Sequence, residues 1–304
     1  LPAWRPDKAM NLEKPEYLDY LKTLSDVSGI EVKSFATLID ALKNRMEFFA
    51  SMGCSVSDHA LEYVMYKPYT DAEIEAIFAK RLSGEQVTVD EMNKFKTAFM
   101  ISVGKEYNRL NWVMQLHYGT IRDNNVLRYN QLGPDTGYDC INTYDCSAEM
   151  AQFLNALNST DELPKTIIYS LNPSVNAAIG TVIGCFQDSK AVGKIQQGSA
   201  WWFNDHKVGM TNQMTSLANL SLLGNFIGML GGLAAVAGGL ALAFGKVAAG
   251  ISLIVGGVGL LVVGIKDIIE NGVTPENTLT VVAGILAAGL GISLLTGSWI
   301  PALI

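Results

Sequence analysis

Residues able to bind anions or transfer protons stand at the ends of predicted strands. His59 and His117 each end a short predicted strand, and Arg5 lies in the opening run Trp4–Asp7. Histidine can transfer protons near neutral pH or ligate a metal, and arginine can hold a carboxylate through two parallel hydrogen bonds. A single such residue is more often a satisfied structural group. The shared place of His59 and His117 at strand ends favours a functional site, and Arg5 would join them if a strand preceded it. A purely structural role for each residue stays an open alternative.

Alternating strands and helices would have to position these residues. Strands are predicted at 54–59, 111–117, 165–171, 193–198 and 225–230, and helices at 15–24, 34–52, 70–82, 89–108, 147–157, 176–185 and 205–223. Ser34 is an expected N-cap, and Thr70 with Glu73 has the capping-box pattern. The alternation predicts parallel βαβ units. The predicted class is therefore α/β, an incomplete (β/α)8 barrel whose site lies at the carboxyl ends of its strands.

Two other segments are expected near such a site. The run Trp201–Asp205 follows a predicted strand, and the turn-rich loop Gly133–Asp139 is interpreted as a βα loop over the site. The sequence has no dinucleotide-binding glycine pattern, Walker loop or Ser–His–Asp order. The cysteines form no CxxC pair, so free thiols are expected at all of them: Cys54, Cys140, Cys146 and Cys185.

Overall charge and the first residues limit the classes of partner. The net charge is -7 and the isoelectric point is about 5.0, which argues against a nucleic-acid partner. The opening residues have neither a basic nor an apolar signal-peptide region, so a cytoplasmic location is expected for the part of the chain before residue 231. The first residue is Leu rather than Met, which predicts a beginning within a longer protein.

Short runs spread over residues 1–230 form a recognisable series. They are Trp4–Lys8, Ser57–His59, Gln115–His117, Ile121–Asn125, Leu132–Gly137, Glu162–Thr166, Leu171–Pro173, Gly198–Asp205 and Gly228–Leu230. In combination they resemble the uronate (glucuronate) isomerase family of the amidohydrolase superfamily. The resemblance implies a distorted (β/α)8 barrel that interconverts D-glucuronate with D-fructuronate, and D-galacturonate with D-tagaturonate. It also implies a divalent metal, zinc in the intact family, and a homo-oligomer.

The resemblance assigns roles to five residues of this sequence. An aldose–ketose isomerase, an intramolecular oxidoreductase, moves a proton between C2 and C1 through an enediol and stabilises an oxyanion. His59 and His117 are the catalytic candidates, in proton-transfer or metal-proximal roles that the resemblance does not separate. Arg5 is the expected anchor of the uronate carboxylate, and Trp201 and Asp135 are expected to bind the sugar.

The sequence departs from the family pattern at both ends of the barrel. Family members begin with a first-strand His-x-His pair that binds the metal, and their last strand continues into an Asp and an Arg. This chain starts after the pair, and Leu230 is followed by Gly231–Leu233. No metal ligands are therefore predicted in this sequence, and the chain as written is expected not to isomerise uronates.

The chain changes character at Met229–Gly231, which predicts one domain at 1–230 and another at 231–304. Residues 208–245, 247–265 and 279–304 carry no Asp, Glu, Lys or Arg. We expect an all-α, Gly/Ala-rich hydrophobic hairpin there, long enough to span a membrane, with packing inside a larger assembly as the rival interpretation. Residues 245–304 also resemble the hydrophobic segments of phage tail tape-measure proteins. The alternative function is thus a membrane-associated or tail-like structural protein carrying an inert part-barrel, or a chimeric reading frame.

Overall fold

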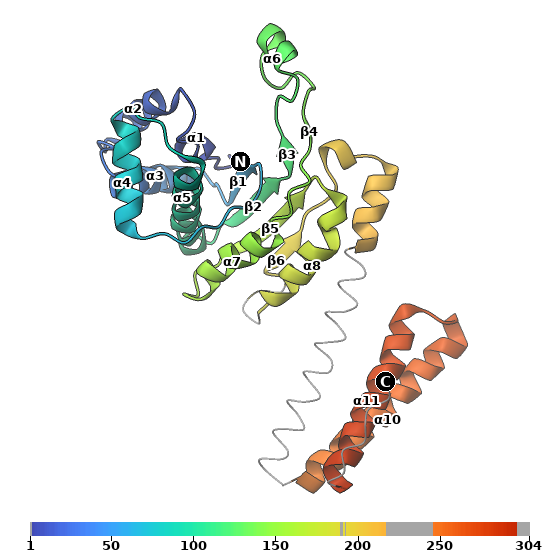
Figure 1. The fold of residues 1–304 in the computed structure, drawn as a ribbon. Helices are drawn as coiled ribbons and strands as arrows, with labels where there is room; N and C mark the ends of the chain where they lie inside the picture. The colour runs from blue at the N-terminus through green and yellow to red at the C-terminus, as the bar shows by residue number, and fades with distance from the viewer. Residues whose placement is uncertain (1, 189–190, 192, 217–245, 297–304) are drawn as a thin grey trace. The chain divides into compact units, whose positions relative to one another are not determined.

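The computed structural model describes residues 2–188, 191, 193–216 and 246–296. The chain divides into two compact units, Leu1–Leu217 and Ala218–Ile304 (Figure 1). The helix expected at 205–223 is helical over 207–216, and its remainder lies outside the described residues. The strand predicted at 225–230 and the composition change at Met229–Gly231 also lie outside them.

A parallel sheet of four strands forms the centre of the described part of the first unit (Figure 1). Its order is β1 (Val56–Leu61), β2 (Val113–Tyr118), β5 (Lys165–Ser170) and β6 (Ile195–Gln197). The register sets Ala60 beside His117 and His117 beside Tyr169. Trp4 adds a single parallel bridge to Ser57 on the other side of β1. The predicted α/β class with parallel βαβ units is confirmed.

Helices connect the strands and bury one face of the sheet. They are α1 (Asp7–Met10), α2 (Tyr17–Ser28), α3 (Phe35–Ser51), α4 (Asp71–Leu82), α5 (Val89–Arg109), α7 (Ser147–Asn158) and α8 (Asn176–Cys185), with 3-10 turns at Pro173–Val175 and Trp202–Asn204. Along β1 and β2, buried side chains alternate with half-buried ones. His59, Leu116 and Ile168 are fully buried on the same face. The other face, which carries His117, is only half buried, so it is the face open to a ligand.

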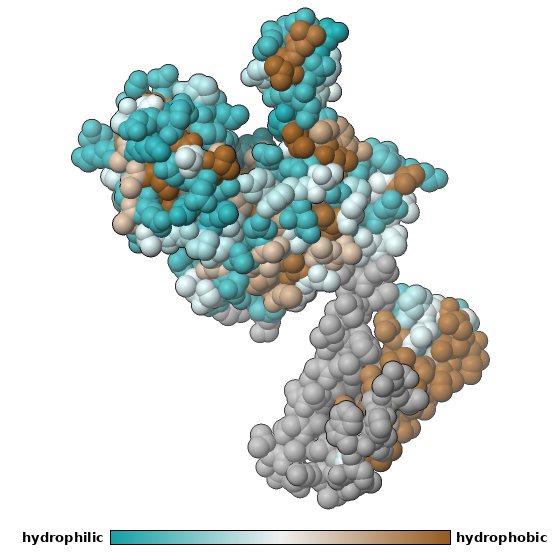
Figure 2. Space-filling view, viewed as in Figure 1, coloured by the Kyte–Doolittle hydropathy of each residue, from teal (hydrophilic) through white to brown (hydrophobic). Residues whose placement is uncertain are grey.

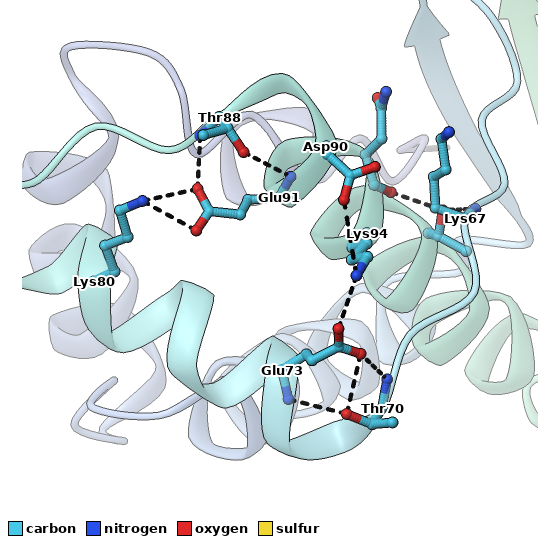
Figure 3. A network of polar contacts seen from close by, with 10 residues as sticks. Lys67, Thr70, Glu73, Lys80, Thr88, Asp90, Glu91 and Lys94 are labelled. Carbon is cyan, nitrogen blue, oxygen red and sulfur yellow. Dashed lines mark hydrogen bonds and ion pairs between the residues drawn. The ribbon is translucent and has the colours of Figure 1, made fainter.

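Capping boxes begin the two helices α4 and α5 (Figure 3). The Thr70 hydroxyl accepts from the Glu73 N–H, and the Glu73 carboxylate accepts from the Thr70 N–H at 2.8 Å, as predicted. At the start of α5, Thr88 and Glu91 make the same pair of hydrogen bonds. Each box acid also binds the other helix: Lys94 lies 2.7 Å from Glu73, and Lys80 lies 2.8 Å from Glu91. The acids therefore cap their own helix and tie α4 to α5.

A two-stranded antiparallel ribbon, β3 (Thr120–Ile121) and β4 (Cys140–Ile141), projects from the sheet and carries α6 (Val126–Leu132) at its tip (Figure 1). The loop Gly133–Asp139 joins α6 to β4, so its prediction as a βα loop is wrong. The segment before it is a helix, because the Asn125 side chain accepts from the Arg128 N–H and a left-handed Gly133 ends the turn.

The second unit is a helical hairpin of α10 (Lys246–Asn271) and α11 (Pro275–Thr296). Gly272, with φ of 78°, lets the chain turn between them. Asn277 fixes the turn: its Oδ1 accepts from the Thr274 N–H at 2.9 Å, and its Nδ2 donates to the Gly272 carbonyl at 2.8 Å. The predicted all-α hydrophobic tail is confirmed over these residues.

All four cysteines are free, as predicted, and they divide by exposure into Cys54 and Cys146, which are buried, and Cys140 and Cys185, which are exposed. Burial raises the pKa of the Cys146 thiol to about 11. The thiolate is the reactive form. We therefore expect two thiols to react rapidly with Ellman's reagent in the native chain at pH 8 and four in guanidinium chloride. Fast reaction of a third native thiol would contradict the packing around Cys146.

Candidate active site

His117 and Asp58 meet on the half-buried face of the sheet. Nδ1 of His117 lies 2.6 Å from Oδ1 of Asp58, and the two side chains are 19% and 24% exposed. The second carboxylate oxygen of Asp58, Oδ2, lies 3.1 Å from Nη2 of Arg5. No hydrogen-bond partner for Nε2 of His117 is found among the described residues. One carboxylate thus holds both the imidazole and the guanidinium, and the far nitrogen of the ring is left for a ligand.

Strand geometry explains why Asp58, rather than its neighbour, reaches His117. Successive side chains of a strand point to opposite faces, and residues paired in register share a face. Ala60 pairs with His117, so Asp58, two residues before Ala60, shares that face. His59 lies between them and points to the helices. Asp58 was part of the run Ser57–His59, but no site role was predicted for it.

The charge on Asp58 sets the tautomer of His117. Burial acts to raise the pKa of Asp58, but the hydrogen bond with His117 and the positive charge of Arg5 outweigh it, and the pKa lies below its usual value. The carboxylate is therefore ionised at neutral pH and can only accept a hydrogen bond. Nδ1 of a neutral His117 must then carry the proton, which leaves Nε2 as a base.

Asp58 should also make stability depend on pH. Since its pKa is lower folded than unfolded, its contribution is present above the unfolded value, about 3.9, and is lost as pH falls through the folded value. We expect Asp58→Asn to lower the free energy of unfolding by about 1 kcal/mol at pH 7 and by progressively less below pH 4. Urea unfolding of both proteins between pH 7 and pH 3 measures the difference. A difference that grows as the pH falls would contradict a depressed pKa.

His59 lies on the opposite face of the sheet and is fully buried. Its Nδ1 lies 3.2 Å from Oδ1 of Asp7, and its Nε2 lies 3.0 Å from the hydroxyl of Tyr107. Both ring nitrogens are therefore engaged inside the fold, and the structure does not bring His59 together with His117. Asp7 in turn lies 3.5 Å from Nε of Arg5. His59 is thus connected to the site through Asp7 and Arg5 and not by a direct contact with His117.

Two aromatic rings enclose the imidazole of His117. Tyr169 stacks on it at 4.1 Å between centroids with an interplanar angle of 11°, and Trp201 meets it edge-on at 4.7 Å. Nε1 of Trp201 is buried and has no hydrogen-bond partner among the described residues. Gly198 makes room for this arrangement, because a Cβ there would overlap the Tyr169 ring. The structure therefore brings the predicted Trp201 to His117, together with Tyr169, for which no role was predicted.

Asp135 lies in the ribbon loop, with its side chain 78% exposed. It pairs with Arg122 at 2.9 Å, and Arg122 also binds Asp139 at 3.0 Å. The Arg122 guanidinium lies 4.9 Å over the ring of Trp202, the neighbour of Trp201. Asp135 thus connects to the imidazole only through this chain of contacts, and the structure does not place it against His117.

Comparison with known proteins identifies the family of residues 1–233. The model of the family described as glucuronate isomerase matches residues 1–233. The chain belongs to the glucuronate isomerase family. The uronate isomerase of Lachnospira eligens is 90% identical over 229 residues, which are 75% of this chain and 49% of that relative. The chain spans about half the length of the curated relatives it matches.

Solved structures of the glucuronate isomerase family show the same fold. The crystal structure of the uronate isomerase from Thermotoga maritima aligns with a TM-score of 0.68 and 26% identity, over 96% of this chain and 61% of that one. The glucuronate isomerase from Caulobacter crescentus aligns with a TM-score of 0.64 and 24% identity, over 72% of this chain and 44% of that one. The predicted barrel-type fold and the resemblance of the first part are therefore confirmed.

The family implies a metal ion, which would need a group of His, Cys, Asp or Glu side chains to hold it. Over residues 2–188, 191, 193–216 and 246–296, no group of three or more His, Cys, Asp or Glu side chains is arranged to hold an ion. His59 has both nitrogens engaged, and His117 has one. The donors of the described residues therefore do not form a metal-ligand set. Zinc stays a prediction from the resemblance.

Proposed function

We propose that the first unit carries uronate-binding and proton-transfer residues of an aldose–ketose isomerase. The substrates are D-glucuronate and D-fructuronate, with D-galacturonate and D-tagaturonate as the second pair. The observation that carries the proposal is the 2.6 Å contact of His117 with Asp58, beside Arg5, on the open face of the sheet. The 90% identical relative that is named a uronate isomerase supports the substrate class.

Nε2 of His117 is the proposed base. It removes the proton from C2 of the open-chain aldose, the C–H electrons form the C1–C2 double bond, and the O1 carbonyl gains a proton to give an enediol. Loss of the O2 proton then forms the C2 ketone, and the imidazolium returns its proton to C1. Ionised Asp58 lies against Nδ1 and stabilises the imidazolium while it exists.

Arg5 is the proposed anchor of the substrate carboxylate. Its side chain is 54% exposed although it contacts both Asp7 and Asp58, so part of its guanidinium remains open to a ligand. Guanidinium binds carboxylate through two parallel hydrogen bonds, which fixes orientation as well as position. Nε1 of Trp201, a buried donor without a partner among the described residues, is suited to a sugar hydroxyl. Asp135, in the loop of the β3–β4 ribbon, is also a proposed sugar-binding residue.

A chimera tests the proposal. The 229 aligned residues of this chain replace their counterparts in the Lachnospira eligens relative, and conversion of glucuronate to fructuronate is measured. We expect turnover within about threefold of the parent, since 90% of the exchanged residues are identical in the two proteins. A folded but inactive chimera would contradict the proposal. The chain by itself, assayed with Zn²⁺ or Mn²⁺, is expected to show no turnover, because Leu230 is followed by Gly231–Leu233 where the family pattern has an Asp and an Arg. Cytoplasmic location and homo-oligomerisation stay predictions.

A further inference from the structure

The second unit exposes large apolar side chains along its helices. Figure 2 shows α10 and α11 mostly in the hydrophobic colour. On α10, Val255 is 66% exposed, Val262 61% and Ile269 78%. On α11, Leu290 is 59% exposed. A hairpin that folds in water would place charged side chains on this outer surface and valines inside. Here the outer surface instead carries exposed valine, isoleucine and leucine side chains.

The contact between α10 and α11 is made by small residues. A Cβ on Gly257 would lie 2.5 Å from the backbone N of Ala288, and a Cβ on Gly264 would lie 2.8 Å from Val281 Cγ2. Gly284 fits equally closely against Leu261. Small residues let two helix backbones approach each other, a mode of packing that needs no water-driven burial of large side chains.

Apart from Lys246 at the outer end of α10, the charge of the hairpin lies near its turn. Between residues 253 and 293 the charged residues are Lys266, Asp267, Glu270 and Glu276. The uncharged run 247–265 spans 19 residues, about 28 Å of helix, which matches a hydrocarbon core of about 30 Å. Among the described residues, one helical stretch is long and apolar enough by length and composition to cross a bilayer: Pro275–Ser293 of α11, of which 28% is buried.

We propose that α10 and α11 cross a lipid bilayer as a hairpin, with the turn 272–274 on one side and both outer ends on the other. The exposed apolar surface meets lipid, the glycine seam holds the helices together, and the helical backbone satisfies its own hydrogen bonds. A second copy of the hairpin could cover part of the apolar surface in water, but side chains on several sides of both helices are exposed. Lipid covers all of them at once.

Sidedness in sealed membrane vesicles tests this proposal. The full chain with Val273→Cys is expressed, and its membranes are washed with alkaline carbonate and floated on a density gradient. A membrane-impermeant maleimide is then applied, with labelled sites identified by peptide mapping. Cys140 is an exposed native thiol of the first unit, and Val273 is 80% exposed at the turn. We expect the chain to float, with Cys140 labelled as the positive control for the reagent and the cysteine at 273 labelled from one side of the membrane only. A cysteine in place of Val262, which is 61% exposed within the apolar run, should stay unlabelled from both sides.

Three outcomes would overturn the proposal. These are release of the chain by carbonate, labelling of the Val262→Cys site in intact membranes, and a soluble oligomer that does not float. A matched pair of variants tests the seam separately, by thermal unfolding in detergent micelles. Gly257→Leu should lower the melting temperature, because its side chain would overlap α11, whereas Gly259→Leu should not, because nothing lies within 4 Å of a Cβ there. Equal melting temperatures would contradict the seam.

Discussion

Replacing His117 by Asn in the chimera is expected to lower kcat for glucuronate by about 10²–10⁴-fold, the usual contribution of a general base. Asparagine keeps a polar group beside Asp58 but cannot take the C2 proton. KM should change little, because carboxylate binding is assigned to Arg5. Solvent-deuterium exchange at C2, followed by proton NMR, should fall with kcat, since removal of this proton is the step assigned to Nε2 of His117.

His206 provides the matched control for His117. It is exposed, its Nδ1 accepts from the Gly209 N–H at 3.3 Å, and it has no place in the proposed chemistry. His206→Asn should leave kcat and KM unchanged. Unchanged turnover in His117→Asn, with a folded protein, would show that the base lies elsewhere. Loss of turnover in both variants would indicate a general effect of histidine removal rather than proton transfer.

Local sequence patterns predicted most elements that position the site. Periodic apolar residues, the N-cap Ser34 and the capping pair Thr70–Glu73 are short-range signals, and the helices that they begin are where they were expected. The strands β1, β2 and β5 were also found within two residues of their predicted bounds. The ribbon β3–β4 was missed, since strands of two residues leave no periodicity to detect.

The candidate site was only partly predictable. A histidine near a strand end suggests chemistry, but its side of the sheet depends on a register that one strand alone does not reveal. His59 and His117 look equivalent in sequence, and the structure places them on opposite faces. The contact of Asp58 with His117 follows from the pairing of β1 with β2, which the sequence alone does not give. Trp201 was placed by the family resemblance, whereas Tyr169 depends on the space left by Gly198, a contact between two strands.

A substitution in the aromatic cluster between α3, α4 and α5 has the largest expected effect on stability. Phe95 is fully buried, stacks on Phe78 at 5.9 Å with an interplanar angle of 3°, and meets Phe35 edge-on at 5.5 Å. Phe95→Ala should lower the free energy of unfolding by about 3–5 kcal/mol, because it removes buried apolar surface and leaves a cavity among three helices. Urea unfolding followed by tryptophan fluorescence measures the loss, and buried Trp4 and Trp112 report on this unit.

Val89 is the control on the same helix, 69% exposed at its first turn. Val89→Ala should change the free energy of unfolding by less than about 0.5 kcal/mol. The comparison bears on the site as well, because α5 also carries Tyr107, which holds His59 and, through Asp7, the guanidinium of Arg5. A loss below about 1 kcal/mol for Phe95→Ala would mean that the helices collapse around the cavity. Arg5 would then depend less on this packing than its contacts indicate.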